Sequence, residues 1–237
     1  MKRFVALGTI AIVAIAVARC SWPGADTTRA LPPDRRAAIV YVALGDSTVE
    51  GVAATRTDRT YVGQLFTRLR GIYPQAQLKN LGVGGAVSND VLTSQLGRAI
   101  ALQPDLVTVS IGPNDVTGGV PVGTYEKNIG EIFDKLRRTT PAVIVVNLLP
   151  DLTVTPRYRD SPRRATLAAK TTEFNDALTR QARKHGVLVV DLYTKSRAEV
   201  PGNPALIAAD GYHPSDLGYA RWAELMWEVI EPTVAPR

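Results

Sequence analysis

The sequence predicts an α/β protein, in which a parallel five-stranded sheet lies between two layers of helices in a three-layer α/β/α sandwich. From Arg35 onward, short runs rich in β-branched residues alternate with longer amphipathic stretches, which is the pattern of parallel strands joined by crossover helices. The chain has 237 residues, of which 45% are hydrophobic and 21% charged. This balance is that of an ordinary globular protein, so we expect one domain with one well-filled core.

The strands are predicted in five short runs that separate the amphipathic stretches. In chain order they are Ile39–Leu44, Gln77–Leu81, Leu106–Ile111, Val143–Asn147 and Val187–Leu192. Parallel strands that enter helices through short turns place ligand sites at their carboxyl ends, where the crossover loops gather. The functional residues are therefore expected directly after the strands.

Apolar residues at helical spacing predict three of the covering helices and form their core-facing stripes. The first stripe follows a cap at Thr124 and consists of Tyr125, Ile129, Ile132, Phe133 and Leu136. The second follows Ser161-Pro162, a cap with proline at the first helical position, and consists of Leu167, Phe174 and Leu178. That helix is expected to end at His185-Gly186. The last helix is expected over about 215–230, with Leu217, Leu225 and Val229.

The N-terminus has the features of an export signal. Residues Met1–Arg3 are basic, and Phe4–Ala18 is an apolar run of fifteen residues, which suits a signal-peptide core and is short for a membrane span of about 20 residues. Ala16–Ala18 supplies the small-x-small pattern of a cleavage site. We predict a signal peptide over 1–18, a tether over 19–35 and the folded domain over 36–237, with the protein secreted or held in the cell envelope.

Two other fates of this segment stay open. Cys20, the only cysteine, follows the apolar run as the acceptor cysteine of a lipoprotein signal does, although Arg19 stands where such signals have a small residue. Either lipidation of Cys20 or an uncleaved apolar segment would anchor the protein to a membrane. A single cysteine excludes an intrachain disulfide.

The charge of the chain argues against a nucleic-acid partner. The formal net charge is +6, and loss of Lys2 and Arg3 with the signal would leave 6 − 2 = +4. The arginines are scattered among acidic residues, without a dense basic run or an interleaved aromatic pattern. We therefore expect no nucleic acid among the partners, while some preference for an anionic surface stays open.

Two motifs follow the first two predicted strands. Gly45–Gly51 places Ser47 at a strand-to-helix turn, where its hydroxyl is presented beside helix-start amides that stabilise negative charge. Asn80–Ala86 contains three glycines that let the backbone approach a ligand, but Val87 stands at the sixth position of a dinucleotide fingerprint, so that match fails. Taken alone, the first motif is typical of a helix cap and the second of a tight turn.

Two further motifs lie after the third strand and before the last helix. Gly112–Asp115 includes Asn114, whose amide can donate a hydrogen bond, although the motif alone is ordinary turn chemistry. In Asp210–Pro214, His213 is the only plausible base for a serine nucleophile, because the other histidine, His185, ends a helix. Asp210, three residues earlier, can bind the other ring nitrogen of His213, although an isolated motif of this kind is more often a capped surface turn.

Together, in this order, the four motifs resemble the Gly-Asp-Ser, glycine, Gly-x-Asn-Asp and Asp-x-x-His blocks of the SGNH (GDSL-type) hydrolases, over about 39–230. The resemblance implies a flavodoxin-like fold and a serine esterase without a cofactor. It assigns Ser47 as nucleophile, with His213 and Asp210 as its partners. The implied oxyanion hole consists of the Ser47 amide, the Gly85 amide and the Asn114 side chain. Thr48 departs from the leucine often found after the serine.

The implied substrates are carboxylic esters, thioesters or acetylated sugars, and we expect a monomer acting on a small-molecule or lipid ester. The loops expected to shape the acyl pocket are 117–123, 151–160 and 201–209, whose apolar residues are Val120, Val122, Leu152, Tyr158 and Leu206. Their character favours short to medium acyl chains. The arginines at 157, 159, 163 and 164 either are solvated or meet an anionic lipid or polymer.

The residues disfavour some rival functions and leave others open. No serine lies in the Gly-x-Ser-x-Gly elbow of α/β-hydrolases, and two distant histidines without a His-Glu-x-x-His pair leave little for a zinc site, so no metal is expected. A cell-envelope polysaccharide acetylesterase or acyltransferase would use the same triad in a carbohydrate-lined groove. A non-catalytic binding module with this fold is the third alternative.

Overall fold

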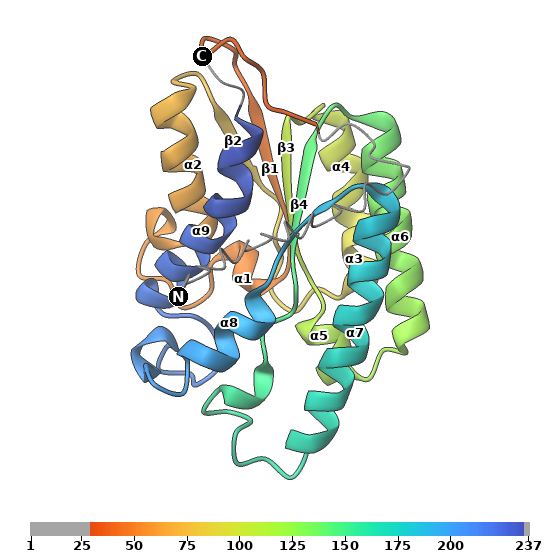
Figure 1. Cartoon of the computed structure of the whole chain (residues 1–237), viewed down its shortest axis with the longest axis vertical. Helices are drawn as coiled ribbons and strands as arrows, with labels where there is room; N and C mark the ends of the chain where they lie inside the picture. The colour runs from red at the N-terminus through yellow and green to blue at the C-terminus, as the bar shows by residue number, and fades with distance from the viewer. Residues whose placement is uncertain (1–28, 235–237) are drawn as a thin grey trace, which may run out of the picture.

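Five parallel strands form the central sheet of the computed structural model, which describes residues 29–234 (Figure 1). The strands are β1 (Val40–Gly45), β2 (Gln77–Asn80), β3 (Leu106–Ser110), β4 (Val143–Asn147) and β5 (Leu188–Val190). Their order across the sheet is β2-β1-β3-β4-β5. The chain passes from β1 to β2 on one side and to β3 on the other, so the topological switch point lies beside the end of β1. The predicted parallel sheet is confirmed, and no strand end differs from its prediction by more than two residues.

Helices cover both faces of the sheet, as the three-layer prediction requires (Figure 1). One face carries α2 (Tyr61–Ile72) and α9 (Asp216–Ile230), and the other carries α4 (Leu96–Ala101), α6 (Val122–Thr139) and α7 (Arg164–His185). The shorter helices are α1 (Ser47–Glu50), α3 (Ser88–Asp90), a π-helical turn (Val91–Gln95), α5 (Pro113–Gly118) and α8 (Leu192–Glu199). Single helical turns lie at Thr57–Arg59, Leu152–Val154, Pro204–Leu206 and Glu231–Thr233.

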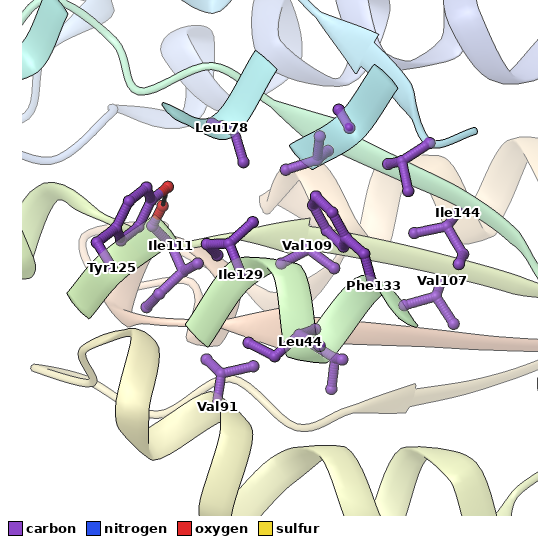
Figure 2. Close-up of a cluster of buried hydrophobic side chains, with 14 of the residues drawn as sticks. Leu44, Val91, Val107, Val109, Ile111, Tyr125, Ile129, Phe133, Ile144 and Leu178 are labelled. Atoms are coloured by element: carbon purple, nitrogen blue, oxygen red, sulfur yellow. Dashed lines mark hydrogen bonds between the residues drawn. The ribbon is translucent and has the colours of Figure 1, made fainter. Parts of the chain in front are cut away.

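The two faces of the sheet build two separate apolar clusters. Successive side chains of a strand point to opposite faces, so Tyr41 packs into the cluster with α2 and α9, whereas Val42 packs into the cluster with α4, α6 and α7. Figure 2 shows the second cluster, where Ile129 and Phe133 of α6 lie against the strands. All five residues of the predicted stripe on α6 are fully buried, which confirms that the stripe is core.

Two predicted caps and one predicted apolar residue differ from the structure. Helix α6 begins before Thr124, because the carbonyl of Pro121 accepts the hydrogen bonds that start it. Ser161 caps a separate turn through the Arg163 amide (3.1 Å), and α7 begins only at Arg164. Leu217 is 51% exposed, because at 100° per residue it lies on the face of α9 opposite the buried Met226.

The last part of the segment predicted as a tether packs on the domain, which is a correction to the boundary at 36. Leu31 is buried, and its amide donates to the Thr233 carbonyl (2.7 Å). The Arg29 guanidinium donates to the carbonyls of Arg137 (2.6 Å) and Thr140 (2.6 Å) at the end of α6. An apolar side chain and a cation at a helix C-terminus dock this segment, so the domain includes 29–35. The predicted signal peptide, Arg19 and Cys20 lie outside the described residues.

Within residues 29–234, none of the helices combines the length and the apolar character that crossing a membrane demands.

Candidate active site

Ser47 is presented where β1 ends and α1 begins. The strand ends at Gly45, whose φ of 147° lies in the region that favours glycine, and a Cβ there would overlap the Ser110 carbonyl oxygen. Gln95 holds this turn, because its side chain accepts from the Gly45 amide (2.9 Å) and donates to the Gly45 carbonyl (2.8 Å). Asp46 caps α1 by accepting from the Thr48 amide (2.9 Å). The serine is therefore the first residue of a short helix with a fixed entry.

Ser47, His213 and Asp210 form a continuous chain of hydrogen bonds. The distance from Ser47 Oγ to His213 Nε2 is 2.9 Å, and that from His213 Nδ1 to Asp210 Oδ2 is 2.6 Å. With Nδ1–H donating to the carboxylate, Nε2 of a neutral imidazole is free to accept the serine proton. The structure thus brings together the three residues that the sequence predicted as a triad, although Ser47 and His213 are 166 positions apart.

Asp210 is held in place by the loop that it orients. Its other oxygen, Oδ1, accepts from the amides of Tyr212 (2.9 Å) and His213 (3.0 Å). Partial burial acts to raise the pKa of Asp210, but the hydrogen bonds from the His213 ring and from these two amides outweigh it and hold the pKa below its usual value. The carboxylate is therefore ionised when it faces the imidazole.

Gly85 and Asn114 follow β2 and β3, the two strands that flank β1. Gly85 has a φ of 78° in the loop after β2. Asn114, in the first turn of α5, donates from Nδ2 to the Ala86 carbonyl (3.0 Å), so its side chain reaches the residue next to Gly85. One hydrogen of the Nδ2 amide group is used in this contact, and the second stays available for a ligand.

The glycine loop is fixed by two side chains that the sequence did not single out. Glu50 of α1 accepts from the Gly84 amide (2.6 Å), and Asn80 accepts from the Gly82 amide (3.0 Å). Within residues 29–234, the amide of Gly85 has no hydrogen-bond acceptor. Of the three neighbouring glycines, Gly85 alone thus presents a free donor.

A buried polar network joins the loops after β2 and β3. Asp115 is fully buried and accepts from the Ser88 amide (2.9 Å) and hydroxyl (2.6 Å). Asn128 of α6 donates to the same hydroxyl (3.0 Å). Burial raises the pKa of Asp115, and the hydrogen bonds from Ser88 oppose that effect. From the sequence alone, Asp115 is assigned to an ordinary turn. Its partner Ser88 is 27 positions away, so no local sequence pattern indicates the contact.

Asp46, next to Ser47, is a second buried carboxyl group, with only 1% of its surface exposed. Burial raises its pKa to about 6, although hydrogen bonds from the Thr48 amide and hydroxyl oppose this. Thr48 Oγ1 donates to Asp46 Oδ1 (2.9 Å). Thr48, which departs from the leucine often found after the serine, therefore has a structural partner, Asp46, in the turn that holds Ser47.

A mainly apolar cavity of about 110 Å³ opens beside His213. Thr48, Tyr212 and His213 border it near Ser47, and its walls are chiefly Leu152, Val154, Leu192, Val200, Leu206, Ile207, Trp222 and Leu225. Two of the predicted pocket residues, Leu152 and Leu206, thus line it. The other three, Val120, Val122 and Tyr158, are not among its lining residues, because the cavity lies between α8 and α9, on the other face of the sheet from α6.

Comparison with known families and structures identifies the family of the chain. The model of the GDSL-like lipase/acylhydrolase family matches residues 43–221, which include the four motifs. The chain belongs to this family. Membership confirms the predicted resemblance.

The sequence identity between the chain and an individual curated relative is low. The chain is 29% identical over 201 residues to the GDSL-like esterase Rv1075c of Mycobacterium tuberculosis, covering 82% of this chain and 62% of that protein. The chain therefore spans less than two thirds of the length of that curated relative.

Solved structures share the fold at low identity. The lipase/acylhydrolase from Enterococcus faecalis is 22% identical with a TM-score of 0.68, covering 84% of this chain and 98% of that one. A catalytic mutant of Axe2, an acetylxylan esterase from Geobacillus stearothermophilus, is 19% identical with a TM-score of 0.68, covering 84% and 97%. These likenesses confirm the α/β fold of the GDSL-like hydrolase.

Proposed function

We propose that this protein is an exported serine esterase that hydrolyses carboxylic esters or thioesters of short to medium acyl chains, lipid esters among them, through an acyl-enzyme. The observation that carries the proposal is the Ser47–His213–Asp210 chain of hydrogen bonds at the carboxyl edge of the sheet. Export rests on the sequence of residues 1–20 alone.

In the proposed reaction, Ser47 Oγ attacks the ester carbonyl carbon while its proton passes to His213 Nε2. The imidazolium is stabilised by the Asp210 carboxylate at Nδ1. As the tetrahedral intermediate collapses, the carbon–oxygen bond to the alcohol breaks, and the proton on Nε2 goes to the departing oxygen. A water molecule then attacks the acyl-enzyme by the same proton path, which releases the acid and restores Ser47.

The oxyanion of the intermediate requires donors on the side of Ser47 away from His213. The Ser47 amide, the free Gly85 amide and the second hydrogen of Asn114 Nδ2 are the donors we assign. Engagement of the Gly82 and Gly84 amides by Asn80 and Glu50 supports Gly85 over its neighbours. Removing one such donor typically costs about 2.7 to 4 kcal/mol of barrier.

The cavity beside His213 supports short to medium acyl chains. A cavity of about 150 Å³ lined by apolar side chains holds one benzene molecule, so a volume of about 110 Å³ has room for roughly four or five carbon atoms. Each buried methylene contributes about 0.8 kcal/mol. Butanoate is therefore expected to be preferred to acetate by about tenfold in kcat/KM, with no further gain for chains that exceed the cavity.

A panel of p-nitrophenyl esters from acetate to decanoate, run beside an acetylated polysaccharide, tests the proposal. Ser47→Ala should abolish ester hydrolysis and labelling by a serine-directed phosphonate, while the exposed Ser94→Ala keeps both. Turnover of the polysaccharide alone would instead support a polysaccharide acetylesterase, and no turnover with an intact fold would support a binding module.

The cavity is tested separately by Val200→Phe, which fills it at the end of α8. This variant should lose about tenfold of its activity on butanoate and hexanoate and keep its activity on acetate. Leu217→Phe, on the exposed face of α9, is the matched control. Equal losses on acetate and hexanoate would show that the acyl chain lies elsewhere.

A further inference from the structure

The loop that carries His213 is built mainly from contacts within itself. This loop, residues 207–215, contains neither helix nor strand. Its turns are closed by hydrogen bonds from the Gly211 amide to the Ala208 carbonyl (2.9 Å) and from the Ala208 amide to the His213 carbonyl (2.8 Å). The Asp210 side chain is 40% exposed. A loop of this kind needs support from outside if the His213 ring is to stay aligned with Ser47.

That support comes from the segment Thr155–Arg159 after β4, which we call the clamp segment. The amide of Arg157 donates to the Gly211 carbonyl (2.9 Å). Gly211 has a φ of 71°, and a Cβ on it would lie 3.3 Å from Pro156 Cβ, so the two backbones approach closely. The clamp segment is itself a turn, because the amides of Tyr158 and Arg159 both donate to the Thr155 carbonyl.

Aromatic contacts continue from the clamp segment to the base. The rings of Tyr158 and Tyr212 pack edge to face with centroids 5.8 Å apart, and those of Tyr212 and His213 with centroids 4.9 Å apart. The Arg157 guanidinium lies 5.3 Å from the centroid of Tyr212 and 5.8 Å from that of Tyr158. In residues 29–234 Arg157 forms no ion pair, so its cation is committed to the two rings.

We propose that Arg157 and Tyr158 are positioning residues, which act through Tyr212 to hold the His213 ring in line with Ser47 Oγ. This inference rests on the proposed serine-esterase function. Proton transfer requires Nε2 within hydrogen-bond distance of the serine, and a displacement of about 1 Å can cost about a hundredfold in rate. Neither positioning residue touches the reacting atoms, so their loss lowers kcat and leaves KM nearly unchanged.

Steady-state kinetics on the best ester of the panel tests this assignment. Arg157→Ala should lower kcat about threefold to fivefold, Tyr158→Leu about tenfold, and neither should change KM by more than about twofold. Arg157→Lys and Tyr158→Phe keep the cation and the ring, and should restore most of the turnover. Arg159→Ala is the matched control, because among residues 29–234 that exposed side chain pairs only with its neighbour Asp160.

A second readout needs no substrate. The Nδ1–H of His213 that donates to Asp210 should give a downfield proton NMR signal. The chain has two histidines, so a signal that persists in His185→Ala belongs to His213. Broadening or loss of this signal in Arg157→Ala and Tyr158→Leu, with unchanged thermal unfolding, would support the proposal. An unchanged signal would overturn the proposal even if no ester is turned over. Where an ester is turned over, kinetic losses shared by Arg159→Ala would overturn it as well.

Discussion

Asp46 beside Ser47 makes the stability of the fold depend on pH, and Asp46→Asn exposes that dependence. Its carboxyl group is 1% exposed, and burial raises its pKa from 3.8 to about 6. A carboxyl group whose pKa is raised by folding binds its proton more tightly in the folded state. Its contribution to stability is therefore fully present below about pH 3.8 and is lost as pH rises through about 6.

The size of this effect follows from the two pKa values. The difference between 3.8 and about 6 corresponds to about 3 kcal/mol, of which about 2 kcal/mol or slightly more is lost between pH 4 and pH 8. The amide introduced by Asp46→Asn does not titrate in this range, while its oxygen can still accept from the Thr48 amide. The free energy of unfolding of this variant, relative to the unmodified protein, should thus rise by about 2 kcal/mol between pH 4 and pH 8.

Urea unfolding followed by tryptophan fluorescence at fixed ionic strength measures this difference at each pH. Asp58→Asn is the control, because it removes the same charge from an exposed turn. A constant stability difference for Asp46→Asn across this range, or one that falls as pH rises, would refute the assignment of a raised pKa to Asp46.

Three further predictions follow from the described contacts and the N-terminal sequence. His213→Ala should lower kcat at least a thousandfold and His185→Ala should leave it unchanged in the ester assay; the reverse result would reassign the base. Asp115→Ala removes a buried cap on Ser88 and should lower the free energy of unfolding by about 3 to 5 kcal/mol. In calorimetry this corresponds to a Tm lower by roughly 6 to 20 °C, and a Tm shift below about 2 °C would contradict the role of the network. Intact mass from an exporting host should give an N-terminus at Arg19, whereas an acylated Cys20 or a retained apolar segment would show an anchored protein.

Most of the sheet was predictable, because the strands differ in pattern from the amphipathic stretches between them. The predicted run over 143–147 agrees with β4 at both ends. The predicted helix starts were less accurate than the strands. Thr124 and Ser161 have the residue type of a cap, but each helix begins at the backbone of a nearby residue instead. Docking of Leu31 was missed for a related reason: one leucine between Ala30 and Pro32 has no periodicity to reveal its burial.

The site was predictable where its residues lie in compact motifs and not where distant side chains support them. Ser47 and His213 stand inside short motifs, so they were found although 166 positions separate them. Glu50 holds the glycine loop from 34 positions away, and Asp115 caps Ser88 from 27 positions away. Neither pairing has a local signature, because a carboxylate accepts any amide that the fold brings to it. The hydrogen bond from the Arg157 amide to the Gly211 carbonyl joins two backbones, so no residue type indicates it.

The contacts of Arg29 and Leu31 also place the start of the described chain relative to the proposed site. Leu31 bridges to Val234, and Arg29 binds carbonyls just before β4, so both ends of the described chain meet at the amino end of the strands (Figure 1). Ser47 and His213 stand at the opposite, carboxyl end. Whatever becomes of residues 1–28, the mouth of the site points away from the place where the chain enters the domain. The proposed site and the point where residues 1–28 join the domain therefore lie at opposite ends of the sheet.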